Sequence, residues 1–129
     1  MAALAAKERE GKVLIEAYQK LEKSQEELEH QTTQLRAQLM ENTAVKEELA
    51  LLEDDAEVFK SMGPVLVKLE LSDAKATVKQ RLDRLESEIL RLGDAFKAKE
   101  EEKKTLAGKI TALQSEVRAL EGKASGSEE

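Results

Sequence analysis

The sequence predicts a mainly α-helical fold, in which a long antiparallel two-helix coiled coil has a β-hairpin at the turn between its helices. Leucines and other apolar residues recur at coiled-coil spacing on both sides of the centre of the chain. Between these stretches lies a short segment of β-branched and aromatic residues with Gly63-Pro64 at its middle. A hairpin there reverses the chain, so the two helices must return side by side in opposite directions.

The composition favours long helices over a compact globule. Charged residues make up 37% of the 129 residues, and both signs are interleaved along the chain. That composition is typical of helices with a single apolar face. Large aromatic side chains, which fill most globular cores, are limited to two Phe and one Tyr. We therefore expect one domain spanning residues 1–129.

Charge and the missing residue types limit the partners and compartments that fit this chain. The net charge of −6 would repel nucleic acid and anionic membranes over most of the surface. No apolar run reaches the roughly 18 residues needed to span a bilayer, and the stretch at residues 1–6 is too short for a signal-peptide core. The chain has no cysteine, so it has no disulfide framework and no thiolate metal site. We expect a cytoplasmic protein with no nucleic-acid or membrane partner.

The second helix has the cleaner heptad pattern, and we expect it over about residues 72–121. Its apolar residues alternate between steps of three and four, which is the pattern of a coiled-coil seam. Ser72 is a good N-cap and Gly122 a good stop, and the Ser-, Gly- and Glu-rich residues 122–129 are predicted to be disordered. The seam residues are Val78, Leu82, Leu85, Ile89, Leu92, Phe96, Leu106, Ile110, Leu113, Val117 and Leu120, interrupted by Lys99 and Lys103.

The first helix is expected over about residues 5–53, where the acidic run Glu53-Asp54-Asp55 favours its end. Leucines recur there at seven-residue spacing, and a second set of residues occupies the companion seam position. The first set is Leu14, Leu21, Leu28 and Leu35, and the second is Tyr18, Gln25, Thr32 and Leu39.

A polar layer is expected midway along the coiled coil. Folding the chain about Gly63-Pro64 places Gln25 near Lys103 and Leu28 near Lys99. Two interpretations remain open for this layer. In the first, the layer is structural: it sets the register of the two helices or is merely solvated. In the second, it contacts a bound protein.

The hairpin, expected over about residues 56–70, is predicted to be an assembly surface. Strict alternation puts Val65, Val67 and Leu69 on one face of its second strand. A two-stranded hairpin alone is barely stable and leaves two unpaired edges, so it calls for strands from other chains. The alternative is that it only turns the chain and packs on its own helices. The predicted interface residues are Val58, Phe59, Met62, Val65, Leu66, Val67 and Leu69.

A second candidate surface lies at the far ends of the helices, which the fold-back brings together. The continuous apolar run at residues 13–15 is too wide for a single two-helix seam, so part of it is expected to face solvent. This surface either binds another protein or merely completes the seam. The candidate residues are Val13, Leu14, Ile15, Tyr18, Ile110, Leu113, Val117 and Leu120.

No combination of residues indicates catalysis. His30 is the only histidine, and no second His or Cys can join it as a metal ligand. The acidic clusters lack the spacing of a calcium loop, and the glycines are too scattered to cradle a phosphate. We expect a protein that is not an enzyme and that has no cofactor and no metal.

The inner half of the chain resembles a known family. The similar stretches are residues 38–42, 45–49, 58–60, 74–78 and 81–82, and the most specific is Gly63-Pro64-Val65-Leu66-Val67-Lys68. Together they span about residues 35–92. On these residues the chain resembles prefoldin, and within it the beta-class subunits of the subunit 6 type.

The resemblance implies a hetero-hexamer of two alpha-class and four beta-class subunits, in which the hairpins join into an intersubunit β-barrel. It also implies ATP-independent capture of unfolded proteins, in eukaryotes especially actin and tubulin, and their delivery to the cytosolic group II chaperonin. The alternative is a coiled-coil tether or scaffold without chaperone activity. The hairpin argues against this alternative, because a tether gains nothing from exposed strand edges.

Overall fold

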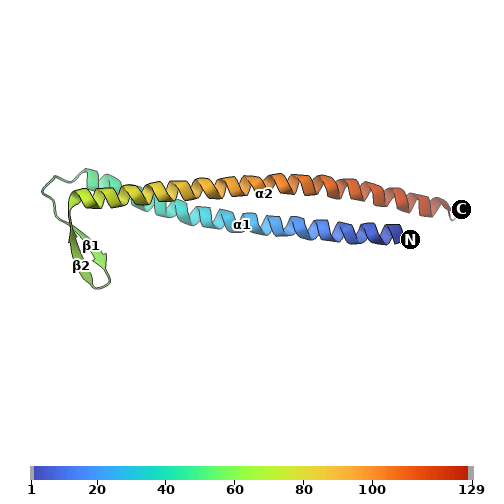
Figure 1. The fold of residues 1–129 in the computed structure, drawn as a ribbon, viewed down its shortest axis with the longest axis horizontal. Helices are drawn as coiled ribbons and strands as arrows, with labels where there is room; N and C mark the ends of the chain where they lie inside the picture. The colour runs from blue at the N-terminus through green and yellow to red at the C-terminus, as the bar shows by residue number, and fades with distance from the viewer. Residues whose placement is uncertain (1, 128–129) are drawn as a thin grey trace. The chain divides into compact units, whose positions relative to one another are not determined.

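The computed structural model describes residues 2–127 and contains two long helices with a β-hairpin between them in sequence (Figure 1). Helix α1 is Ala2–Ala50 and helix α2 is Leu71–Ser127. Strands β1 and β2 are Val58–Met62 and Val65–Leu69. Both helices are free of proline and rich in Ala, Leu, Glu and Lys, which are strong helix formers. The predicted fold class, mainly α-helical with a β-hairpin at the turn, is confirmed.

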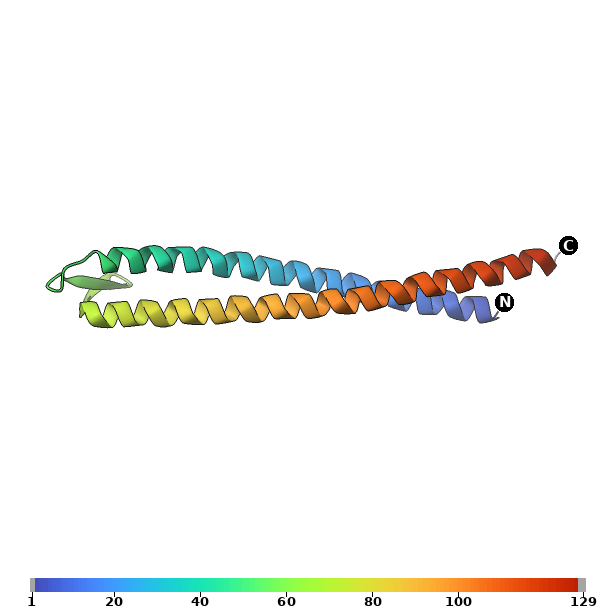
Figure 2. The same cartoon turned by 90° about the horizontal axis from the view of Figure 1, so that it is seen from above.

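Contacts between residues divide the chain into two compact units, and both helices contribute to each of them. The terminal unit combines Met1–Glu29 with Asp94–Glu129. The hairpin unit is His30–Gly93 and contains both strands. Within the hairpin unit, the strands lie at the end where α1 stops and α2 begins (Figure 2).

In the terminal unit, α1 and α2 pack in opposite directions along the predicted seam. Lys7 Nζ, early in α1, lies 2.6 Å from Glu116 Oε2, late in α2. Further along α1, Gln25 Oε1 lies 2.8 Å from Lys103 Nζ, which comes earlier in α2. Residue numbers therefore rise on one helix as they fall on the other, as expected for an antiparallel pair. The apolar seam residues are buried or half-buried: Leu14, Tyr18, Leu21, Leu28, Phe96, Leu106, Ile110, Leu113, Val117 and Leu120.

The hairpin unit has an apolar core that joins both helices to the base of the hairpin. Five buried residues form the core, and two partly buried residues, one from α1 and one from β1, pack against them. Burying a Val or Leu side chain contributes about 1.5–3 kcal/mol, so this cluster stabilises the packing of both helices against the base of the hairpin. The buried members are Leu49, Leu71, Ala74, Val78 and Leu82, and Leu39 and Val58 pack against them.

The turn of the hairpin depends on Gly63. The strands pair antiparallel with Met62 opposite Val65, which leaves a two-residue loop of Gly63 and Pro64. Gly63 has a φ of +61°, the only positive φ among the described residues. Proline fixes its own φ near −65°, so the loop takes the sign pattern of a type II′ turn, whose first central residue is normally glycine.

The element boundaries differ slightly from those predicted. Helix α1 ends at Ala50 rather than near residue 53, because Leu51 N donates to Glu48 O and Leu52 N to Leu49 O in tight, 3₁₀-type turns. Helix α2 begins at Leu71, one residue early. Helix α1 also begins at Ala2, three residues before its predicted start. Only the shift at the start of α2 is within the one or two residues by which helix ends commonly vary.

The predicted stop at Gly122 is wrong. Helix α2 continues through Gly122 to Ser127, so residues 122–127 are helical rather than disordered. A glycine ends a helix by adopting positive φ, which Gly122 does not do. Inside a helix it costs only about 1 kcal/mol relative to Ala, and each further residue adds another backbone hydrogen bond. Residues 128 and 129 of the predicted tail lie outside the described residues.

Candidate functional site

The first candidate surface is the hairpin, whose two faces follow from its register. Directly opposed residues of an antiparallel pair share a face. One face carries the pairs Val58–Leu69, Lys60–Val67 and Met62–Val65, so five of its six residues are apolar. The other face carries the pairs Phe59–Lys68 and Ser61–Leu66. The predicted alternation is therefore confirmed.

Most of the predicted interface residues are exposed. Val58 and Leu69, at the base of the hairpin, are partly buried. Beyond them, side chains on both faces are open to solvent: Phe59 at 50%, Met62 at 56%, Val65 at 58%, Leu66 at 67% and Val67 at 40% exposure. The described sheet has only two strands, so each strand also has one edge without a strand partner.

A groove of about 310 Å³ lies where the hairpin meets the helices of its unit. Its walls are mostly apolar, and Lys60 and Arg81 add positive charge. The groove therefore continues the exposed face of the hairpin onto α1 and α2. The apolar lining residues are Val45, Leu49, Val58, Phe59, Leu69, Ala74 and Val78.

The second candidate surface lies in the terminal unit, and the structure brings together only part of the predicted set. Ile15 of α1 lines a groove of about 300 Å³ with Ile110, Leu113 and Val117 of α2. Lys7, Glu8, Arg118 and Glu121 also line this groove, so it carries both signs of charge.

The other predicted terminal residues lie elsewhere. Leu14 and Leu120 are half-buried on the seam. Val13 is 65% exposed and does not line the groove. Tyr18 has its ring centroid 5.4 Å from Lys103 Nζ, and so belongs to the polar layer.

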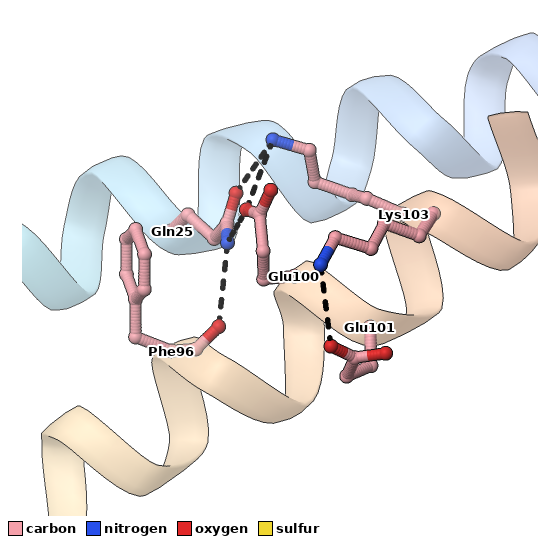
Figure 3. Close-up of polar contacts among 6 residues, drawn as sticks. Gln25, Phe96, Glu100, Glu101 and Lys103 are labelled. Carbon is pink, nitrogen blue, oxygen red and sulfur yellow. Dashed lines mark hydrogen bonds and ion pairs between the residues drawn. The ribbon is translucent and has the colours of Figure 1, made fainter.

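That polar layer joins the two helices of the terminal unit (Figure 3). The Gln25 side chain donates from Nε2 to the Phe96 carbonyl oxygen at 3.3 Å and to Glu100 Oε2 at 2.8 Å. Its Oε1 accepts from Lys103 Nζ at 2.8 Å. The hydrogen bond from Gln25, and then the charge of Lys103, lower the pKa of Glu100 below its usual value. The predicted proximity of Gln25 and Lys103 is confirmed.

Sequence reasoning missed three features of the terminal unit. Glu100 belongs to an acidic run for which no role was predicted, yet it lies about one helical turn before Lys103 and so reaches the same layer. The fold-back that pairs Gln25 with Lys103 would place Lys7 opposite Glu121, so the ion pair of Lys7 with Glu116 did not follow from residue numbers alone. The third feature is the close approach of Gly11 to Leu113, where a Cβ on Gly11 would lie 3.4 Å from Leu113 Cδ2. In the sequence, only the presence of a glycine at a seam position could have indicated this contact.

The remaining polar residues form no further site among residues 2–127. His30 is exposed, and its Nε2 lies 3.4 Å from Gln34 Nε2 one turn along α1. No group of three His, Cys, Asp or Glu side chains is arranged to hold a metal ion in this range. None of the described helices has an apolar stretch long enough to cross a membrane.

Comparison with known proteins identifies the family. Residues 12–117 match the sequence model of the family described as "Prefoldin subunit". The chain belongs to the prefoldin subunit family. Prefoldins are co-chaperones rather than enzymes, and the matched residues include the hairpin, the polar layer and the apolar side chains that line the terminal groove.

Individual relatives agree with this assignment. The chain is 47% identical over 111 residues to prefoldin subunit 6 of Homo sapiens, covering 83% of this chain and 84% of the relative. It is 36% identical over 96 residues to prefoldin subunit 6 of Saccharomyces cerevisiae, covering 74% and 84% of the two chains. The resemblance seen in the sequence is therefore confirmed.

A solved structure supports the fold. The crystal structure of the prefoldin beta subunit from Thermococcus strain KS-1 matches with a TM-score of 0.57 and covers 86% of this chain and 91% of that one. The two sequences are 23% identical, so this likeness concerns the fold alone.

Proposed function

We propose that this chain is a beta-class subunit of a cytoplasmic prefoldin hexamer, built from two alpha-class and four beta-class subunits. The hexamer captures unfolded proteins such as actin and tubulin without ATP and delivers them to the group II chaperonin. The observation that carries this proposal is a hairpin with exposed apolar side chains on both faces and two unpaired edges, in a chain of the prefoldin family.

The energetics of the hairpin support a role in assembly. Its base lies against the helices, where Val58 packs on the buried cluster and Leu69 is partly buried, while the side chains toward the turn are exposed. A two-stranded hairpin is marginally stable in water and gains independent stability from further strands. Covering each exposed Val or Leu is worth about 1.5–3 kcal/mol. Strands from neighbouring subunits would satisfy both needs at once by closing an intersubunit β-barrel, with Val58, Phe59, Met62, Val65, Leu66, Val67 and Leu69 at the interface.

The terminal groove supports a role in holding clients. Unfolded chains present irregular apolar segments flanked by charges of either sign. The groove offers an apolar floor that includes Ile15, Ile110 and Val117, with charged side chains of both signs around it. One such groove holds a segment weakly, and several subunits acting together raise the overall affinity through avidity.

The assembly role is tested by replacing Val65 and Val67 with Lys. Both lie on the face with five apolar residues, so two charges there would oppose burial in a barrel. We expect the variant to stay helical by circular dichroism, yet to be missing from hexamers reconstituted with its partner subunits and weighed by native mass spectrometry. The matched control places the same charges at exposed helix positions of the same unit, as Ala76→Lys with Gln80→Lys, and should assemble.

A hexamer that takes up the Val65→Lys, Val67→Lys variant as readily as wild type would contradict the barrel. Loss of assembly in both variants would show only that added charge is harmful, and would equally remove the support for a hairpin interface.

A further inference from the structure

Gln25 is the one buried polar side chain among the described residues, at 4% exposure. All of its partners lie on α2: the carbonyl of Phe96, the carboxylate of Glu100 and the ammonium group of Lys103 (Figure 3). No described buried side-chain nitrogen or oxygen atom lacks a hydrogen-bond partner. A buried amide is costly without partners and inexpensive with them, so its burial depends on which residues α2 places opposite it.

Lys103 makes the dependence stronger. It occupies a seam position in place of an apolar residue, and its side chain is only 16% exposed. Its ammonium group donates a hydrogen bond to Gln25 Oε1 and forms an ion pair with Glu100 Oε2 at 3.7 Å. It also makes a cation–π contact with the ring of Tyr18, whose centroid is 5.4 Å away. Three partners from both helices therefore hold one ammonium group in place.

The apolar part of the seam does not specify a register so well. Leucines recur every seven residues on both helices, as Leu14, Leu21 and Leu28 on α1 and as Leu106, Leu113 and Leu120 on α2. Sliding one helix by seven residues, about 10 Å, places leucine positions opposite leucine positions again. Residues 51–57, which are neither helix nor strand, are a connection that can take up part of such a shift.

The polar layer does not survive that shift. With α2 moved by one heptad in one direction, Ala107 and Ile110 replace Glu100 and Lys103 opposite Gln25. In the other direction, Gly93 and Phe96 replace them. In either case Gln25 loses the carboxylate and the ammonium group that now bond its side chain, and such a loss is the penalty that lets a polar core residue select one register.

We infer that the layer formed by Tyr18, Gln25, Glu100 and Lys103 fixes the register of α1 against α2 in the terminal unit. This register is what places Ile15 beside Ile110 and Val117 in one groove. The inference concerns helix pairing and stands whether or not the groove holds clients.

The test is a cross-linking ruler on the full chain, which has no cysteine of its own. Lys7→Cys with Glu116→Cys reports the observed register, because the native side chains meet at 2.6 Å. Lys7→Cys with Lys109→Cys, or with Lys123→Cys, reports a slip of one heptad in either direction. All of these positions except Lys7, which is half-buried, are exposed. A bis-maleimide shorter than the slip of about 10 Å distinguishes them.

The variant is Gln25→Leu with Lys103→Leu, which replaces the buried amide and its ammonium partner by apolar side chains and leaves Lys99 as the polar seam residue of α2. We expect it to remain helical and to melt no lower than wild type, since replacing buried polar groups by apolar ones is often neutral or stabilising. We also expect at least a tenfold rise in the yield of a slipped cross-link. The control, Leu21→Met with Leu106→Met, keeps the layer and roughly conserves volume, and should give the wild-type pattern.

The inference is overturned if the double leucine variant gives the Lys7–Glu116 cross-link alone. That result would assign the register to the core of the hairpin unit and to the connection at residues 51–57. A variant that loses its helical signal would also overturn it, because the layer would then be needed for helix pairing as such rather than for register.

Discussion

The hairpin unit and the terminal unit both bring α1 against α2, yet their interiors differ. In the hairpin unit the two helices bury a continuous apolar cluster, and Leu92 is buried as well. In the terminal unit, Leu113 is the only buried apolar side chain among those described, and the buried polar residue is Gln25. The unit that carries the proposed assembly surface thus has the larger buried apolar core. The unit that carries the candidate client surface has a looser and more polar seam, of the kind that opens more easily.

The largest expected effect compares two leucines of equal exposure. Leu82 in the hairpin unit and Leu113 in the terminal unit are both 7% exposed. Leu82 lies within the cluster, so Leu82→Ala leaves a cavity that rigid neighbours cannot fill, at about 2–5 kcal/mol. Leu113 lies beside Gly11 and half-buried residues that can close in, so Leu113→Ala should fall at the low end of that range.

Amide hydrogen exchange of the two alanine variants measures this difference unit by unit. The comparison also predicts that, in the wild type, helical amides of the terminal unit exchange faster than those of the hairpin unit. Equal costs at the two leucines, with equal protection in both units, would show that the buried cluster does not make the hairpin unit more stable.

A smaller effect is expected at the hairpin turn. Gly63 has nothing within 4 Å of the position of a Cβ, so Gly63→Ala meets no steric clash and pays only for its φ of +61°. We expect a loss of about 1–2 kcal/mol in the stability of the hairpin. Gly108→Ala is the matched control, since Gly108 also has open space but lies inside α2. It should stabilise the terminal unit by up to about 1 kcal/mol.

Thermal unfolding followed by circular dichroism measures both changes: Gly63→Ala should lower the melting temperature and Gly108→Ala should raise it. If the two substitutions change the melting temperature in the same direction, then the backbone conformation of Gly63 is not what the turn requires.

The fold was predictable because its determinants are local and periodic. The heptads on both sides of the hairpin fixed the seam, and Gly63-Pro64 fixed the fold-back that brings Gln25 to Lys103. The end of α2 was not predictable from residue type, because a glycine stops a helix only when it adopts positive φ, and Gly122 does not. Which of the terminal residues share a groove was also beyond the pattern. The rotation of each helix leaves Val13 outside the groove while its near neighbour Ile15 lines it.

The central claim is that assembly and client holding reside in different units and can be separated. Its most direct test replaces Leu14, Ile15 and Val117 with Ser in the terminal unit, and measures how well the reconstituted hexamer suppresses aggregation of unfolded actin diluted from denaturant. The control variant carries Lys12→Ser, Glu16→Ser and Lys109→Ser, all at exposed positions of the same helices. We expect the serine variant to give a hexamer with the mass expected for full assembly and reduced suppression, and the control to act like wild type. Full suppression by the serine variant, together with its loss when Gln25 and Lys103 are changed, would contradict the account and place the client site at the polar layer.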